Sequence, residues 1–295
     1  MFRDTDNRLG GVLSRKAVAA QLADAVALLD TGSYDEATGR ELFAAVGDLG
    51  SVAGWMAFDA GRHRSAQDLF ITALHAASEA GDRALGAHLL QCMARQMSHL
   101  EHFDDALDLV SLAQYGARRE ATCATRSMLS SLQARFHAIL GQVEESERAA
   151  GLAEELFTQI VPGDEPEHMA FFDEAELSAT LGVAHQIAAK HERDTRRARR
   201  AEKSLTLLGR ALALRPAHRV RSKAFDALAL ARTHLTVGEV TGAHRETQAA
   251  LELFGTIGSK RVSDRLAELH DEAEPYVSTP EASDLRERIQ SAIAT

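Results

Sequence analysis

The chain has few cysteine, proline and aromatic residues, and it has no long apolar run. Its 295 residues include 2 cysteines and 5 prolines, and only 5% are aromatic. Cys92 and Cys123 lack a paired spacing, which argues against a disulfide framework, and we expect both to be reduced core thiols. No apolar stretch approaches 18 residues, and residues 1–11 lack the apolar centre of a signal peptide. We expect a soluble, cytoplasmic protein that has no membrane partner.

Positive charge is also in short supply, since the formal net charge is −10. A chain of this charge does not attract nucleic acid in bulk, so we expect no direct nucleic-acid binding. The basic run at residues 193–200 is diluted by Glu192 and Asp194 and has no interleaved aromatic residues. We interpret it as a solvated loop or the start of a helix, with docking of a partner as the alternative.

The motifs of common catalytic sites are missing. The sequence contains no nucleophile–base pair, no glycine-rich phosphate loop and no dinucleotide fingerprint. His99 and His102 share a spacing of three residues, but no third metal ligand accompanies them. We therefore expect no enzyme activity, no cofactor and no metal site.

What the sequence does have is a repeated frame of small and large residues. Gly61, Ala66, Phe70 and Ala73 are spaced so that two antiparallel helices touch at the small residues, while Phe70 fills the space between neighbouring pairs. The frame returns at three other places: Phe103, Ala106, Val110 and Ala113; Val143, Ser146, Ala150 and Ala153; Gly238, Val240, Ala243, Thr247 and Ala250. Repetition of one helical hairpin predicts an all-α solenoid, a class of fold that presents a binding surface.

The repeats divide the chain into three parts. We expect a lead-in at 1–17, six hairpins at 18–257 and capping helices at 258–295. The first hairpin is predicted at 18–47, with its turn at 31–34, and the second at 48–80. The fifth, at 170–216, is irregular, because about 10 extra residues separate Ala189 from Ser204. The last helix before the tail, 260–273, is predicted to cover the exposed end of the stack.

These strings resemble the tetratricopeptide repeat. The residues that match are Gly54, Gly61, Ala66, Phe70 and Ala73 in the second hairpin, and Ala231, Gly238, Ala243 and Ala250 in the sixth. The resemblance implies a right-handed superhelical solenoid of tetratricopeptide-like hairpins. The pattern departs from that family in its period of 40 residues instead of 34. It also departs where Glu101 and Ala189 replace the turn glycine.

A second resemblance lies in residues 6–11, 53–63 and 80–88. These strings look like the sensory part of actinobacterial transcriptional regulators, which join a helix-turn-helix DNA-binding domain to tetratricopeptide repeats. The resemblance implies a regulatory role linked to transcription. Met1 stands where the DNA-binding domain would finish, so we expect either a stand-alone relative or a trimmed chain, and DNA binding is not carried over.

In a solenoid of this kind the first helix of each hairpin lines the concave face. Counting six residues back from each turn gives Trp55, Arg95, Arg135, Val183 and Arg232, so three arginines stand in one inward column. The complete predicted ligand groove is Trp55, Phe58, Asp59, His88, Gln91, Arg95, His99, Met128, Ser131, Arg135 and Arg232. Guanidinium groups bind carboxylates and peptide carbonyls through paired donors. This mix suits a peptide, a protein segment or a small acidic effector.

Several alternatives remain open at this point. The arginines of the column can instead pair with Asp or Glu on adjacent helices, and Trp55 can pack against the first hairpin instead of anchoring a ligand. The leading hypothesis is a regulatory module that binds protein, peptide or small effector. The alternatives are a passive scaffold, including a homodimer, and, more remotely, an enzyme built on a helical solenoid.

Overall fold

The structure, a computed structural model, describes residues 15–257 and 259–294. Regular secondary structure in these two ranges is helical throughout, as predicted. The predicted lead-in at 1–17 falls almost wholly outside the described residues, as does the string at 6–11. No helix of the described ranges is long and apolar enough to span a membrane.

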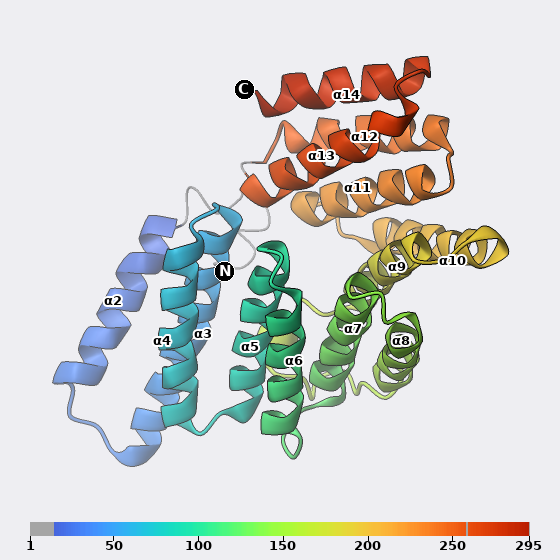
Figure 1. The fold of residues 1–295 in the computed structure, drawn as a ribbon. Helices are drawn as coiled ribbons and strands as arrows, with labels where there is room; N and C mark the ends of the chain where they lie inside the picture. The colour runs from blue at the N-terminus through green and yellow to red at the C-terminus, as the bar shows by residue number, and fades with distance from the viewer. Residues whose placement is uncertain (1–14, 258, 295) are drawn as a thin grey trace.

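The helices pair in chain order into hairpins that stack along an arc (Figure 1). Helix α2 (Arg15–Thr31) packs on the first hairpin, and the 3₁₀ turns η1 (Glu167–Met169) and η2 (Glu274–Tyr276) precede α9 and α14. The pairs are α3 (Glu36–Asp59) with α4 (His63–Ala80), α5 (Arg83–His99) with α6 (Phe103–Ala117), α7 (Cys123–Ile139) with α8 (Val143–Phe157), α9 (Glu174–Lys190) with α10 (Asp194–Leu214), α11 (Val220–Thr236) with α12 (Val240–Phe254), and α13 (Lys260–Glu272) with α14 (Pro280–Ile293).

The two helices of each pair belong to different layers. The first helices contact one another in sequence, α3 with α5, then α7, α9, α11 and α13, and the second helices lie outside them. Figure 1 shows α2 to α8 side by side, after which the chain turns at α9 and α10 so that α11 to α14 lie across one end of the first row. We call the side of the first helices that lies within the arc the inner face.

The turns inside the hairpins have the left-handed conformation that glycine adopts at no steric cost. Gly61, Gly141 and Gly238 have φ values of 71°, 73° and 78°, and Glu101 takes the same place with φ of 65°. The prediction that Glu101 replaces the turn glycine is confirmed. The matching prediction for Ala189 is wrong, because this residue is still within α9.

The predicted boundary between the first and second hairpins is also wrong. Residues 47 and 48 lie in the middle of α3, a single helix of 24 residues that pairs with α4. Two glycines in the second half of this helix are close-packing positions. A Cβ at Gly50 would lie 2.8 Å from the Ala73 Cβ, and one at Gly54 would lie 2.5 Å from the Phe70 ring. The predicted first hairpin is therefore α2 together with the first half of α3.

The extra residues of the fifth hairpin lengthen a helix. α10 begins at Asp194 and has 21 residues, so the basic run forms its first turns. Arg200 in this run pairs with Glu147 of α8 and with Glu192. The sequence allowed the basic run to be either a solvated loop or the start of a helix, and in the structure it is the start of a helix.

The predicted capping helix corresponds to α13. Val262, Leu266 and Leu269 on one side of α13 are buried against α11 and α12. α14 follows from Pro280 and adds Leu285 and Ile289 to the same cluster. The opposite side of α13 is charged and turns toward the inner face, where it meets α3 and α5.

We predict that Gly54→Ala lowers the free energy of unfolding by about 1–3 kcal/mol, because the added methyl overlaps the buried Phe70 ring. Gly151→Ala is the matched control, since a Cβ at this exposed position of α8 meets nothing within 4 Å. The control should gain about 0.5–1 kcal/mol from better helix propensity. Urea denaturation measures both, and equal stability of the two variants would contradict this packing of α3 on α4.

Candidate ligand-binding face

The inner face has a buried carboxylate, Asp59, at the end of α3. Asp59 is fully buried and accepts hydrogen bonds from Arg221 of α11 at 2.9 Å and from Arg261 of α13 at 2.8 Å. Ser259, which caps α13, donates a third hydrogen bond at 2.9 Å. Burial alone would raise the pKa of Asp59, but Arg261 and Arg221 hold it below its usual value. Asp59 is therefore ionised and joins helices about 160 to 200 positions apart in sequence.

Arg261 also covers the aromatic residues at the end of α3. Its guanidinium carbon lies 4.7 Å from the ring centroids of both Trp55 and Phe58, and 5.3 Å from that of Phe225. These distances are within the range of cation–π attraction. Trp55 is partly buried and Phe58 is 1% exposed. Both predicted groove residues thus contact a side chain of the protein's own helix α13.

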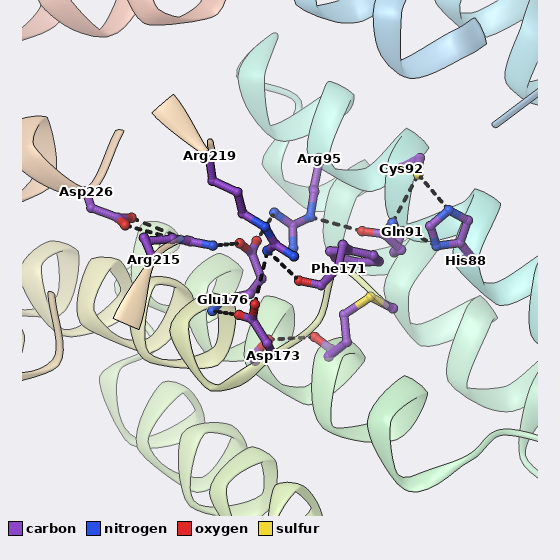
Figure 2. Close-up of polar contacts among 12 residues, drawn as sticks. His88, Gln91, Cys92, Arg95, Phe171, Asp173, Glu176, Arg215, Arg219 and Asp226 are labelled. Carbon is purple, nitrogen blue, oxygen red and sulfur yellow. Dashed lines mark hydrogen bonds and ion pairs between the residues drawn. The ribbon is translucent and has the colours of Figure 1, made fainter. Parts of the chain in front are cut away.

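A hydrogen-bonded chain crosses the inner face from α5 to α11, and Figure 2 shows its members. Arg95 donates to Gln91 at 3.0 Å and to Glu176 of α9 at 3.3 Å. The other oxygen of Glu176 accepts from Arg215 at 2.9 Å, and Arg215 also binds Asp226 of α11 at 2.9 Å. The chain therefore links three of the first helices through side chains.

The ionisation state of this chain follows from its neighbours. Burial raises the pKa of Glu176, but Arg215 and Arg95 act in the opposite direction more strongly and lower it to about 2. The two carboxylates beside Arg215 raise its pKa despite its burial. Glu176 and Arg215 are therefore both charged at neutral pH.

The segment between α8 and α9 covers another part of the predicted groove. The ring centroid of His168 lies 5.0 Å from that of His88, and the ring centroid of Phe171 lies 5.7 Å from it. His88 and Gln91 are consequently 6% and 2% exposed. This connection occupies space that the sequence assigned to a ligand.

Arg232 has carboxylate partners on α13. Its Nε donates to Glu272 at 2.9 Å and its Nη1 to Glu268 at 3.0 Å. Burial lowers the pKa of Arg232, but the hydrogen bonds and charges of the two glutamates raise it overall. Like Arg95, Arg232 is thus paired inside the molecule, as the ion-pair alternative expects.

Arg135 differs from the other two arginines of the column. No acidic side chain of the described residues forms an ion pair with it, and its buried Nε has no hydrogen-bond acceptor. Burial, followed by the charges of Arg265, Arg95 and Arg232, lowers the pKa of Arg135 to about 9. The guanidinium remains protonated at neutral pH, in surroundings that disfavour its charge.

The remaining predicted groove residues have structural contacts. His99 lies 3.3 Å from Asp264 of α13, and burial together with Arg265 lowers its pKa to about 4, so its ring is neutral at pH 7. Met128 is 0% exposed within the central apolar cluster, and Ser131 is equally buried, donating to the Met128 carbonyl. Met128 and Ser131 therefore do not line a groove, because they point into the packing between helices.

The sequence placed these residues on the correct helices but did not indicate how closely the inner helices approach one another. Four charged residues that fill the inner face were missed: Glu176, Arg215, Arg221 and Arg261. A signal was present for two of them, because Glu176 and Arg221 are charged residues in helices α9 and α11, which are otherwise largely buried. Charges in such positions need partners.

Because Arg232 and Arg95 hold partly buried carboxylates, we predict that Arg232→Gln and Arg95→Gln each lower the free energy of unfolding by about 1–3 kcal/mol. Arg40→Gln is the matched control, since Arg40 pairs with Glu36 on the exposed surface of α3. Its effect should stay within about 0.5 kcal/mol. Thermal and urea denaturation provide the comparison, and inner-face variants as stable as the control would show that these pairs contribute nothing.

Comparison with known proteins identifies the fold alone. No protein-family model matches the sequence, and no curated protein matches it significantly. Among solved structures, the chain is similar to the crystal structure of BtubC (BKLC) from P. vanneervenii, with a TM-score of 0.51 and 18% sequence identity. The match covers 80% of this chain and 91% of that chain. This likeness is consistent with the all-helical, repeat-like fold described above.

Proposed function

We propose that the protein is a regulatory binding module, not an enzyme, whose inner face recognises an acidic segment of a peptide or protein or a small acidic effector. In this proposal the hairpins form a right-handed, tetratricopeptide-like superhelix in the cytoplasm. The role in transcriptional control is proposed from the strings at 53–63 and 80–88, which resemble those of actinobacterial regulators.

One observation carries the proposal: the inner face already binds acidic side chains of α13. Arg232 holds Glu268 and Glu272 of this helix, and Arg265 of the same helix also contacts Glu268. Arginines gather here although the whole chain has a net charge of −10. A face that binds acidic side chains of its own chain has the chemistry to bind those of a partner.

The inner arginines also suit a protein ligand in their geometry. Guanidinium groups present several donors in a fixed plane, which matches the oxygens of a carboxylate and the carbonyls of an extended peptide. Trp55 and Phe225 add partly buried aromatic surface beside Arg261. A ligand at this face competes with α13, so its binding is coupled to the position of that helix.

We predict that a fluorescein-labelled 12-residue peptide rich in Glu binds the full chain, and that the same peptide with Gln in place of Glu binds at least about tenfold more weakly. Arg265→Gln should weaken binding of the Glu peptide by about tenfold, the loss of roughly 1.4 kcal/mol. Arg148→Gln is the matched control, because Arg148 also pairs with a glutamate three residues away but lies on the outer helix α8. Fluorescence anisotropy gives the affinities.

The same experiment contains the results that oppose the proposal. Equal affinity for the Glu and Gln peptides would contradict recognition of acidic groups at the inner face. So would an equal loss of affinity in Arg265→Gln and Arg148→Gln. Hydrogen exchange should in turn show protection by the peptide in α7 and α13, and protection confined to α4, α6 and α8 would place the ligand elsewhere.

A scaffold or homodimer is the second candidate, and one observation favours it. Leu112 and Tyr115 of α6 and Leu152 of α8 are 54%, 66% and 44% exposed on the outer layer. Leu112 and Leu152 occupy equivalent positions of neighbouring repeats. A constitutive dimer in sedimentation velocity, together with no Glu-dependent peptide binding, would favour this candidate.

A further inference from the structure

Two arginine side chains of neighbouring inner helices present buried donors without acceptors. The Nε of Arg135 on α7 and the Nη2 of Arg95 on α5 are both buried and make no hydrogen bond. The charge of Arg95 is among those that lower the pKa of Arg135, so the two guanidinium groups share one electrostatic neighbourhood. Buried N–H donors of charged groups are costly to leave unpaired.

The carboxylates of this neighbourhood are already shared. Glu176 contacts Arg95 and Arg215, and Glu268 contacts Arg232 and Arg265. Glu272 likewise contacts Arg232 and Lys190. Each of these acids therefore contacts two other cations, and none of the described acids forms an ion pair with Arg135, although the charge of Glu268 acts on it. The cluster holds positive charge that the protein itself does not balance.

We propose that Arg135, together with the free donor of Arg95, forms a subsite for a single carboxylate group. A planar carboxylate accepts from two guanidinium groups at once, as Glu176 does from Arg95 and Arg215. A phosphate that carries two charges on one group is disfavoured, because Glu176 and Glu268 stand close to the same arginines and repel the second charge, whereas the second carboxylate of a dicarboxylic acid lies farther away. The subsite rests on the proposed function, and it places the ligand's acidic group at Arg135 and Arg95.

Two sources supply such a group: a free dicarboxylic acid and an Asp or Glu side chain of a peptide. Succinate serves as the small probe, and the Glu-rich 12-residue peptide serves as the other. Side-chain Nε–Hε signals of ¹⁵N-arginine in the full chain report on the guanidinium groups directly. Sodium chloride at matched ionic strength controls for screening, and inorganic phosphate tests the class of anion.

We expect succinate to shift the Arg135 and Arg95 signals in a saturable manner and to raise the melting temperature. Arg135→Gln should abolish both effects, while Arg148→Gln leaves them unchanged. Without ligand, Arg135→Gln should melt at the same temperature as the parent or higher, because it removes an unbalanced buried charge. This result separates a binding residue from a structural one, since loss of a structural ion pair lowers the melting temperature.

Shifts of the Arg95 signal by succinate that persist in Arg135→Gln would overturn the subsite. Shifts of equal size caused by phosphate would also overturn it. So would a large loss of stability in Arg135→Gln without ligand. The two proposals fail separately. If the Glu-rich peptide binds Arg135→Gln as tightly as the parent, the subsite is wrong while acidic recognition stands. If succinate binds at Arg135 and the peptide does not bind, the subsite stands, recognition of a peptide or protein segment is wrong, and only the small-effector form of the proposed function remains.

Discussion

The buried carboxylate of Asp59 joins the first hairpin of the stack to its last. It accepts from Arg221 on α11 and from Arg261 and Ser259 at the start of α13. Removing one partner of such a pair leaves an uncompensated charge in the interior, which is strongly destabilising even where the intact pair adds little net stability. The position of α13 is therefore tied to the end of α3. A stack of hairpins that contact only their neighbours has no such constraint.

Closure of the arc turns the inner face into a polar core. Side chains that would face solvent in an open solenoid instead meet across the arc, as Arg95 meets Glu176 and His99 meets Asp264. The low pKa of His99, caused by burial and by Arg265, reflects the same exclusion of water. Cations are in excess within this core because acids such as Glu268 are shared. In the proposed function, an acidic ligand relieves the repulsion among these cations.

The sequence was sufficient to predict the local structure. The small residues of the frame, such as Ala66 and Ala106, are fully buried, and the turn positions Gly61 and Glu101 have the expected left-handed backbone. These features depend on neighbours in sequence, for which side-chain spacing is informative. The boundary at 47–48 and the turn position at Ala189 were wrong, because the spacing of small residues does not fix the residue at which a helix ends.

The candidate site could be predicted only in part, because it depends on the curvature of the stack of repeats. Counting along the repeats placed Arg95, Arg135 and Arg232 on the inner face, but the distance across the arc is the sum of small rotations between repeats that spacing does not encode. Hence the partners Glu176 and Glu272 were missed, and Arg135 could not be distinguished from the arginines that have partners. The difference among three similar arginines emerges only when the ends of the stack are brought together.

The central claim, closure of the arc by Asp59, is tested most directly by a distance measurement between α4 and α13. Nitroxide labels at Glu79 and Asp271, both exposed, in a Cys123→Ala background allow pulsed electron resonance on the full chain. We expect one narrow distance distribution in the parent and a broader, longer one in Asp59→Asn, which cannot balance two arginines. An equally narrow and unshifted distribution in Asp59→Asn would contradict the account.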